Sequence, residues 1–159
     1  MIAAKIILIG SFLIMLKQDV KHREIDMLYP ILMAISGFYL NFQNNYLIEL
    51  VYITLLNLCF LGLYVVLGLL VVKHVLKLKA KQAIGSGDIL LFAAAAFCFP
   101  TVSFIVLFVF SMLFSLGLFF LTRHKSQHKT IPLAGFMCAF FGIAYLSYWL
   151  GLTPDLYLI

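Results

Sequence analysis

The residues of this chain whose types could do chemistry are its acids, and only six are present. Asp88 follows two glycines in the stretch GSGD at 85–88 and precedes an apolar run. A second acid, Asp19, follows the first apolar segment in the stretch QDVKHREI. An acid at the edge of a membrane segment is costly and commonly marks function. These two carboxylates are therefore the first candidates for a site.

Two carboxylates that meet at a low-dielectric boundary cannot easily both ionise, so the pair holds one shared proton. The ionised member can take a proton from a water molecule, while the protonated member polarises a peptide carbonyl. This chemistry is aspartic peptide hydrolysis, which needs neither a metal nor another cofactor. Gly85 and Gly87 suit it because glycine allows unusual backbone angles and the close approach of a substrate strand.

Simpler roles for the acids remain open at this point. Asp88 could be the N-cap of the helix that follows it, and Asp26 could be the N-cap of the second apolar segment. Pro30 would then be tolerated in the first turn of that segment. Asp19 could belong to a solvated loop of mixed charge.

The composition indicates the class of protein. Hydrophobic residues make up 65% of the 159 residues and charged residues only 11%, against about a quarter charged in soluble domains. We predict an all-α polytopic membrane protein that forms a single domain over residues 1–159 and sits in a lipid bilayer. Met1–Leu16 has no small-residue cleavage site after it, so we interpret it as a retained helix.

Six apolar segments are the candidate transmembrane helices, although a span needs about 20 residues and the fourth is short. They are Ile2–Leu16, Met27–Phe42, Leu47–Val72, Ile89–Phe99, Val102–Leu121 and Ile131–Leu150.

The basic residues test this count, because all of them except Lys5 lie in three connections. These are Lys17, Lys21 and Arg23; Lys73, Lys77, Lys79 and Lys81; and Arg123, Lys125 and Lys129. With six spans all three connections fall on one side, which the positive-inside rule makes cytoplasmic. We therefore predict a multi-pass protein of the plasma (inner) membrane with both termini outside. Asp19 and Asp88 then lie at the same cytoplasmic boundary and can meet.

Other chemistry has little support in the sequence. The basic residues are divided among short loops without an aromatic platform, so we expect no nucleic-acid partner. Cys59, Cys98 and Cys138 stand alone and are interpreted as small buried hydrophobes. His124 and His128 have helical spacing but no third ligand nearby, so no metal site is predicted.

The sequence resembles the type IV prepilin peptidases, a family of membrane aspartyl proteases with a G-x-G-D motif. GSGD at 85–88 matches that motif, Asp19 resembles the family's first catalytic aspartate, and TIPLAGFMCAFFG at 130–142 is similar to its last helix. The resemblance implies cleavage of the short basic leader of type IV pilin-like precursors at the cytoplasmic face. It implies a catalytic pair of Asp19 and Asp88, with Gly85 and Gly87 shaping the loop.

The chain also departs from that family. Ile25-Asp26-Met27 stands where the family commonly has Ile-Pro-Asn, and Leu90 stands where a lysine is common. These changes bear on substrate choice, and Asp26 is a possible substrate-binding residue. The cysteine-motif insertion of many members is missing, so the chain resembles the short peptidase form, and N-methyltransferase activity is unsupported.

A non-enzymatic membrane protein is the competing hypothesis. A small transporter or an assembly subunit could use the same acids to bind protons or a partner. A transporter is expected to place its acid in the middle of a span, whereas Asp19 and Asp88 lie at the ends of their segments. The position of these acids favours the peptidase.

Overall fold

The computed structural model describes residues 1–74, 85–122, 132–153 and 155–157, and within these ranges it is all helical, with no strand. Each of the six predicted apolar segments corresponds to a helix, which confirms the all-α class. The helices are α1 (Ile2–His22), α2 (Leu28–Phe42), α3 (Leu47–His74), α4 (Ser86–Ala95), α5 (Thr101–Thr122) and α6 (Leu133–Trp149).

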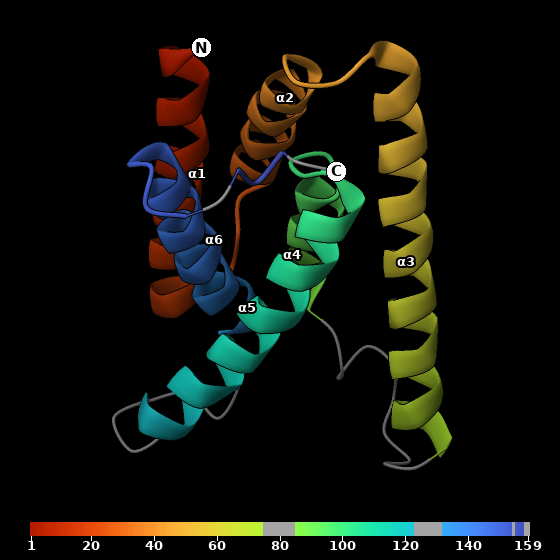
Figure 1. The fold of residues 1–159 in the computed structure, drawn as a ribbon. Coiled ribbons are helices and arrows are strands. Elements are labelled where there is room, and N and C mark those ends of the chain that lie inside the picture. Colours follow the sequence, from red (N-terminus) through yellow and green to blue (C-terminus); the bar gives the residue numbers. More distant parts are fainter. Residues whose placement is uncertain (75–84, 123–131, 154, 158–159) are drawn as a thin grey trace.

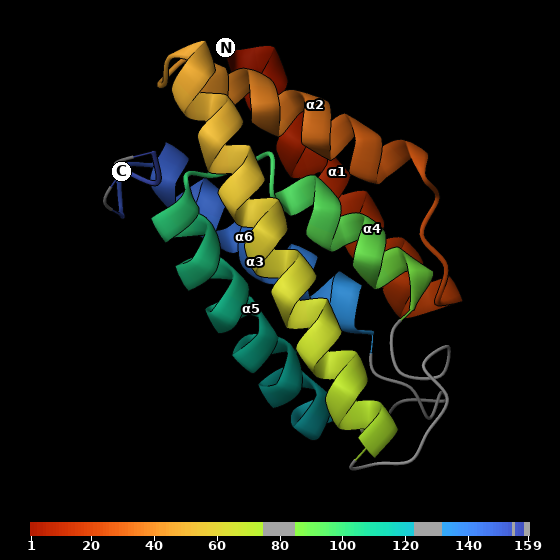
Figure 2. The ribbon, with the colours of Figure 1, turned by 90° about the vertical axis from the view of Figure 1, so that its right-hand side faces the viewer.

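Helix α1 packs most extensively against α6 and α2, and α6 also packs against α5. Figure 1 shows α6 lying over α1, with α5 running obliquely beneath it and α3 standing at the far side of the molecule. In the perpendicular view of Figure 2, α3 lies in front of the other helices, with α4 and α5 on either side of it. The most extensive packing therefore joins α1, α2, α5 and α6.

One end of the molecule collects the helix ends that carry the candidate acids. In Figure 1 the C-terminal end of α1 and the N-terminal ends of α4 and α6 lie at a similar height, above the lower ends of α3 and α5. Asp19 is in the last turn of α1, and Asp88 is in the first turn of α4. The chain direction of these helices thus brings the two acids to one end of the fold.

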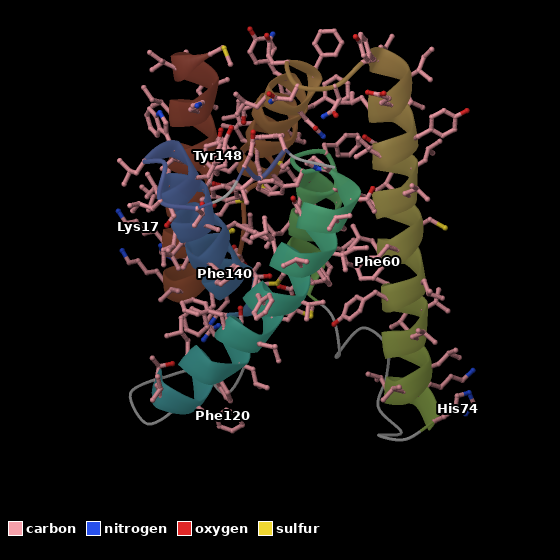
Figure 3. The ribbon with its side chains drawn as sticks, in the orientation of Figure 1. Lys17, Phe60, His74, Phe120, Phe140 and Tyr148 are labelled. Carbon is pink, nitrogen blue, oxygen red and sulfur yellow. The ribbon has the colours of Figure 1, made fainter. Side chains whose placement is uncertain are left out.

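Aromatic packing joins α3 to α4 and α5. The Phe92 and Phe108 rings lie edge to face with centroids 5.1 Å apart, and the Tyr64 ring lies 5.2 Å from Phe108. Figure 3 labels Phe60, which reaches from α3 toward α5, and its ring contacts both Phe104 and Phe108. Edge-to-face pairs of this kind add about 0.5–1.5 kcal/mol each to packing. They hold α3 against its neighbours at mid-height.

Close packing of α2 against the end of α4 depends on Gly37. A Cβ atom at this position would lie 2.9 Å from the Cα atom of Cys98, which is closer than real Cβ contacts allow. Small residues at helix contacts are how membrane helices approach one another closely. Cys98 and Cys138 are buried as predicted, but Cys59 is exposed, so the prediction for that cysteine was wrong.

Two helices are long and apolar enough to cross a membrane by length and composition, namely α3 and α5. Only 11% of the apolar window of α3 is buried inside the protein, so most of its apolar side chains face outward. The α4 helix has 10 residues and is about 15 Å long, which is too short for a crossing. Helix α1 has the length, but it carries Lys5, Lys17 and Asp19.

The C-terminal end of α4 is fixed by a buried side chain on α3. Asn57 is completely buried, and its Nδ2 donates hydrogen bonds to the backbone carbonyl oxygens of Ala96 and Phe99, each at 2.9 Å. These carbonyls lie just past the helix, where a chain reversal leads to Pro100 and α5. Helix ends leave such carbonyls without intrahelical partners, so the Asn57 side chain supplies the hydrogen-bond donors that the backbone lacks here.

We therefore expect Asn57→Ala to destabilise the protein by about 2–3 kcal/mol, because two buried carbonyls lose their donor. Unfolding in detergent micelles, by heat or by denaturant, measures this difference. Asn44→Ala is the matched control, since Asn44 is exposed and makes a single bond to the Leu40 carbonyl. Equal stability of the Asn57→Ala variant and the wild type would contradict this account of α4.

Candidate active site

The two candidate acids meet at the N-terminal end of α6. The backbone N–H of Ala134 donates to Asp88 Oδ1 at 3.1 Å, and the backbone N–H of Gly135 donates to Asp19 Oδ2 at 2.6 Å. Amides in the first turn of a helix have no intrahelical partner, and the helix dipole makes this end favourable for negative charge. Consecutive amides of one helix thus hold both carboxylates side by side.

Asp88 is tied to its own helix as well as to α6. Its second oxygen, Oδ2, accepts a hydrogen bond from the backbone N–H of Gly85 at 3.3 Å. Gly85 is the N-cap of α4, and Asp88 is three residues further on. The interpretation of Asp88 as the N-cap was therefore wrong. Because each oxygen accepts one backbone N–H, the carboxylate is held at a fixed orientation between α4 and α6.

The two motif glycines provide room, and unusual backbone angles are not their role. Gly85 has φ −70° and ψ 147°, which any residue adopts, and Gly151 is the only glycine with positive φ among the described residues. The prediction of unusual angles was wrong. A Cβ atom at Gly85 would lie 3.1 Å from Asp88 Oδ2, and one at Gly87 would lie 3.2 Å from Ile25 Cδ1. Both glycines let neighbouring side chains approach the start of α4.

Gly135 is a site residue that the sequence reasoning missed. A Cβ atom there would lie 3.0 Å from Asp19 Oδ2 and 3.1 Å from Asp19 Cβ. Glycine at this position therefore leaves room for the Asp19 carboxylate to approach the Gly135 N–H closely. The signal was present in the stretch TIPLAG, where a glycine stands within the first turn of the last predicted helix.

Burial raises the pKa values of both carboxyl groups. Asp19 lies beyond the apolar segment 2–16, and burial raises its pKa, which the Gly135 N–H and the positive charge of Arg23 partly offset. Asp88 lies before the apolar segment 89–99. Its pKa is raised by burial first and then by the negative charge of Asp19, while the N–H groups of Gly85 and Ala134 lower it.

These surroundings differ in a way that separates the two acids. Asp19 has the shorter N–H bond and the nearby cation Arg23, and charge-assisted hydrogen bonds are the shorter ones. Asp88 has the negative charge of Asp19 beside it. Two interacting carboxyl groups titrate as a pair, and these surroundings make the two members of the pair unequal.

Asp26 does not join this pair. Gln18 Nε2 donates to Asp26 Oδ2 at 2.6 Å, and the Asp26 backbone N–H donates to Gln18 Oε1 at 3.3 Å. The N-cap of α2 is Met27, without a side-chain hydrogen bond, so the interpretation of Asp26 as a cap was wrong. Asp26 is exposed, and its bonds to Gln18 tie the end of the α1–α2 connection, just before α2, back to α1.

Within the described residues no group of three or more His, Cys, Asp or Glu side chains could hold a metal ion. His124 and His128 lie outside the described residues. The same is true of Lys77, Lys79, Lys81, Arg123, Lys125 and Lys129, so the predicted orientation of the basic connections rests on the sequence.

Comparison with known proteins gives a family. The model of the type IV leader peptidase family matches residues 6–121, which include Asp19, Gly85, Gly87 and Asp88 and end before α6. Among curated proteins and solved structures, none matches the chain. The matched residues make up more than half of the sequence. The chain therefore belongs to the type IV leader peptidase family.

Proposed function

We propose that the chain is a membrane aspartic endopeptidase that cleaves the short leader of type IV pilin-like precursors, with Asp19 and Asp88 as its catalytic pair. The observation that carries this proposal is the anchoring of both carboxylates on the consecutive N–H groups of Ala134 and Gly135. Family membership supports the general activity, because the family is one of leader peptidases. The residues and the cleaved bond are our proposal.

In the proposed reaction a water molecule lies between the two carboxyl groups. Ionised Asp19 takes a proton from the water as its oxygen attacks the scissile carbonyl carbon, and protonated Asp88 donates its proton toward the carbonyl oxygen. Asp19 then returns a proton to the leaving amine as the C–N bond breaks, and Asp88 is reprotonated as the carbonyl re-forms. The pair thus ends with one shared proton, as it began.

The helix end of α6 has two effects on this chemistry. Its N–H groups fix the separation and orientation of the carboxyl groups before substrate arrives, which is the kind of preorganisation that lowers a barrier. Its dipole also offsets the cost of holding negative charge away from water. No metal or cofactor enters the proposal, and it includes no N-methylation of the product.

We further propose six transmembrane spans in the plasma membrane, with the site at the cytoplasmic face. The basic connections support this arrangement, since Lys17, Lys21 and Arg23 lie near the end of α1 that carries Asp19, and the other basic residues except Lys5 lie in two further connections. Figure 3 labels Lys17 beside α1 at about mid-height of the molecule and His74 lower down, at the end of α3. In this arrangement the short helix α4 and the turn that leads to Pro100 form the fourth span.

Asp19→Asn and Asp88→Asn should each abolish cleavage of a pilin-like precursor while the protein still accumulates in the membrane. An amide can neither accept the proton of the water nor share one. Losing acid–base function costs about 10²–10⁴-fold, and losing water activation as well takes the activity below detection. Incubation of purified variants with precursor, followed by mass spectrometry of the product, measures cleavage and identifies the cleaved bond.

Asp26→Asn is the matched control for both variants. Asp26 is exposed and hydrogen-bonded to Gln18, so the Asp26→Asn variant should keep its cleavage activity within a few-fold of the wild type. If Asp26 is essential and Asp19 is dispensable, the wrong carboxylate has been paired with Asp88. If all three variants cleave the precursor normally, the peptidase proposal is wrong for this chain.

Gly135→Ala should lower activity although it changes no ionisable group. The added methyl group would lie 3.0 Å from Asp19 Oδ2 and 3.1 Å from Asp19 Cβ, so Asp19 and the α6 N-terminus must shift apart slightly, and the positions of catalytic groups affect the rate steeply. Gly142→Ala on the same helix is the control, because its Cβ atom would lie 3.7 Å from Phe12 Cβ, an ordinary contact. Steady-state cleavage assays compare the two. Equal activities would show that the Asp19–Gly135 contact is not needed.

The topology can be tested by labelling single cysteines in a variant that lacks Cys59, Cys98 and Cys138. A cysteine at Asn44 should react with a membrane-impermeant maleimide in intact cells. Cysteines at Lys21 and His74 should react only after the membrane is permeabilised, because both positions belong to basic connections. Labelling of Lys21 and His74 from opposite sides would overturn the six-span arrangement.

A further inference from the structure

Lys5 is the one lysine or arginine of the sequence that lies outside the three basic connections. It stands near the start of α1, at the opposite end of that helix from Asp19. In the proposed topology this end of α1 faces the outside, where the positive-inside rule disfavours basic residues. The proposed reaction does not use Lys5, so its position calls for another reason.

The Lys5 ammonium group lies over two aromatic rings of α6. Its Nζ atom is 5.7 Å from the centre of the Tyr148 ring and 5.8 Å from the centre of the Trp149 ring. Both distances lie within ~6 Å, the range in which a cation is attracted to an aromatic face. Lys5 and Tyr148 are partly buried, and Trp149 is exposed. The last turn of α6 therefore holds a side chain from the start of α1.

Helices α1 and α6 meet at two further levels. At the site, Asp19 Oδ2 accepts a hydrogen bond from the Gly135 N–H at 2.6 Å. Midway along α1, the Phe12 ring lies 6.0 Å from the Phe141 ring, centroid to centroid, and a Cβ atom at Gly142 would lie 3.7 Å from Phe12 Cβ. The order of these contacts shows that the two helices run antiparallel.

The three levels of contact are equally spaced along both helices. The contact positions are seven residues apart on each helix, namely Lys5, Phe12 and Asp19 on α1 and Gly135, Gly142 and Trp149 on α6. Seven residues are about two helical turns, or roughly 10 Å, and residues at this spacing share one face of a helix. A shift of α1 along α6 would therefore disturb the contacts at both ends together.

We propose that Lys5 is a positioning residue, whose contact with Tyr148 and Trp149 fixes the register of α1 against α6 and so keeps Asp19 at the Gly135 N–H. This inference rests on the proposed function, in which Asp19 is catalytic. Lys5 lies about 21 Å from Asp19 along α1. It therefore acts through the helix, and not by contact with the substrate.

Disulfide formation measures the register directly and needs no substrate. In a Phe12→Cys, Gly142→Cys double variant the two Cβ atoms would lie 3.7 Å apart, close to the ~3.8 Å of disulfides. The background lacks the native cysteines, which are Cys59, Cys98 and Cys138. An oxidant should link the two introduced cysteines readily when α1 and α6 are in register, and the rate of linking is read on gels.

In this background Lys5→Met and Trp149→Leu should each slow the linking roughly 2- to 10-fold, the change expected from loss of a cation–π contact. The double variant should be no slower than Lys5→Met, because both changes remove the same contact. Lys5→Arg should keep the wild-type rate, since arginine makes this contact too. Tyr46→Leu is the control, because the Tyr46 side chain is 80% exposed.

Cleavage of a pilin-like precursor tests whether the register matters for Asp19. Burial raises the pKa of the Asp19 carboxyl group, and the Gly135 N–H lowers it. Loosening of this contact in Lys5→Met should therefore raise that pKa, move the acid limb of the kcat/KM profile to higher pH and lower kcat. Arg23 and Asp88, the charged groups that interact with Asp19, are the same in all these variants.

Trp149→Leu should move the acid limb in the same direction with no change of charge, which separates loss of register from the long-range effect of the Lys5 charge. A loss of stability alone would reduce the amount of active protein and leave the acid limb in place. Unchanged linking in Lys5→Met and Trp149→Leu, or slower linking with an unmoved acid limb, would overturn the proposal. Absence of cleavage by the wild-type protein would instead overturn the peptidase function and the role of Lys5 in it, while the linking rates would still show whether Lys5 fixes the register.

Discussion

The structure depends on one constraint, which is that two carboxylates must be held together at the end of one helix. The first turn of a helix has backbone N–H groups without intrahelical partners. In α6 the N–H groups of Ala134 and Gly135 donate hydrogen bonds to the carboxylates of Asp88 and Asp19. The helix order follows from it. Helix α1 must end, and α4 and α6 must begin, at the same end of the molecule, as Figure 1 shows. The extensive packing of α1 against α6 keeps Asp19 in reach of Gly135.

The sequence predicted the elements well and their contacts less well. Apolar segments bounded by charged or proline-containing connections correspond to all six helices, because burial in a bilayer leaves a strong signal in composition. That Asp19 and Asp88 can meet followed from their positions at the ends of segments, and the structure brings both to α6. The hydrogen-bond donor of each carboxylate could not be predicted from the sequence. Every residue except proline has a backbone N–H, so the sequence does not mark which N–H binds a carboxylate. The role of Gly135 depends on its contact with Asp19, which is 116 positions away in the sequence.

The errors at the glycines and the caps share a physical cause. Gly85 and Gly87 were assigned to backbone freedom, whereas they leave space for the Asp88 carboxylate and the Ile25 side chain. Local rules describe what a residue can do alone, and the reason for these glycines is a neighbour that only the fold supplies. Asp26 shows the same limit. Its position before α2 suited a cap, but Gln18 lies within hydrogen-bonding distance and takes the carboxylate instead.

Charge balance links these observations. Leu90 stands where the resemblance led us to expect a lysine, two residues after Asp88, so the compensating cation is missing from α4. Among the described residues, Arg23 at the end of α1 lowers the pKa of Asp19 by its positive charge, against the effect of burial. A cation beside Asp19, and none at position 90 beside Asp88, makes the two carboxyl groups unequal. In the reaction that we propose, unequal partners divide acid and base roles between them, and this inequality is our reason for proposing Asp19 as the base and Asp88 as the acid.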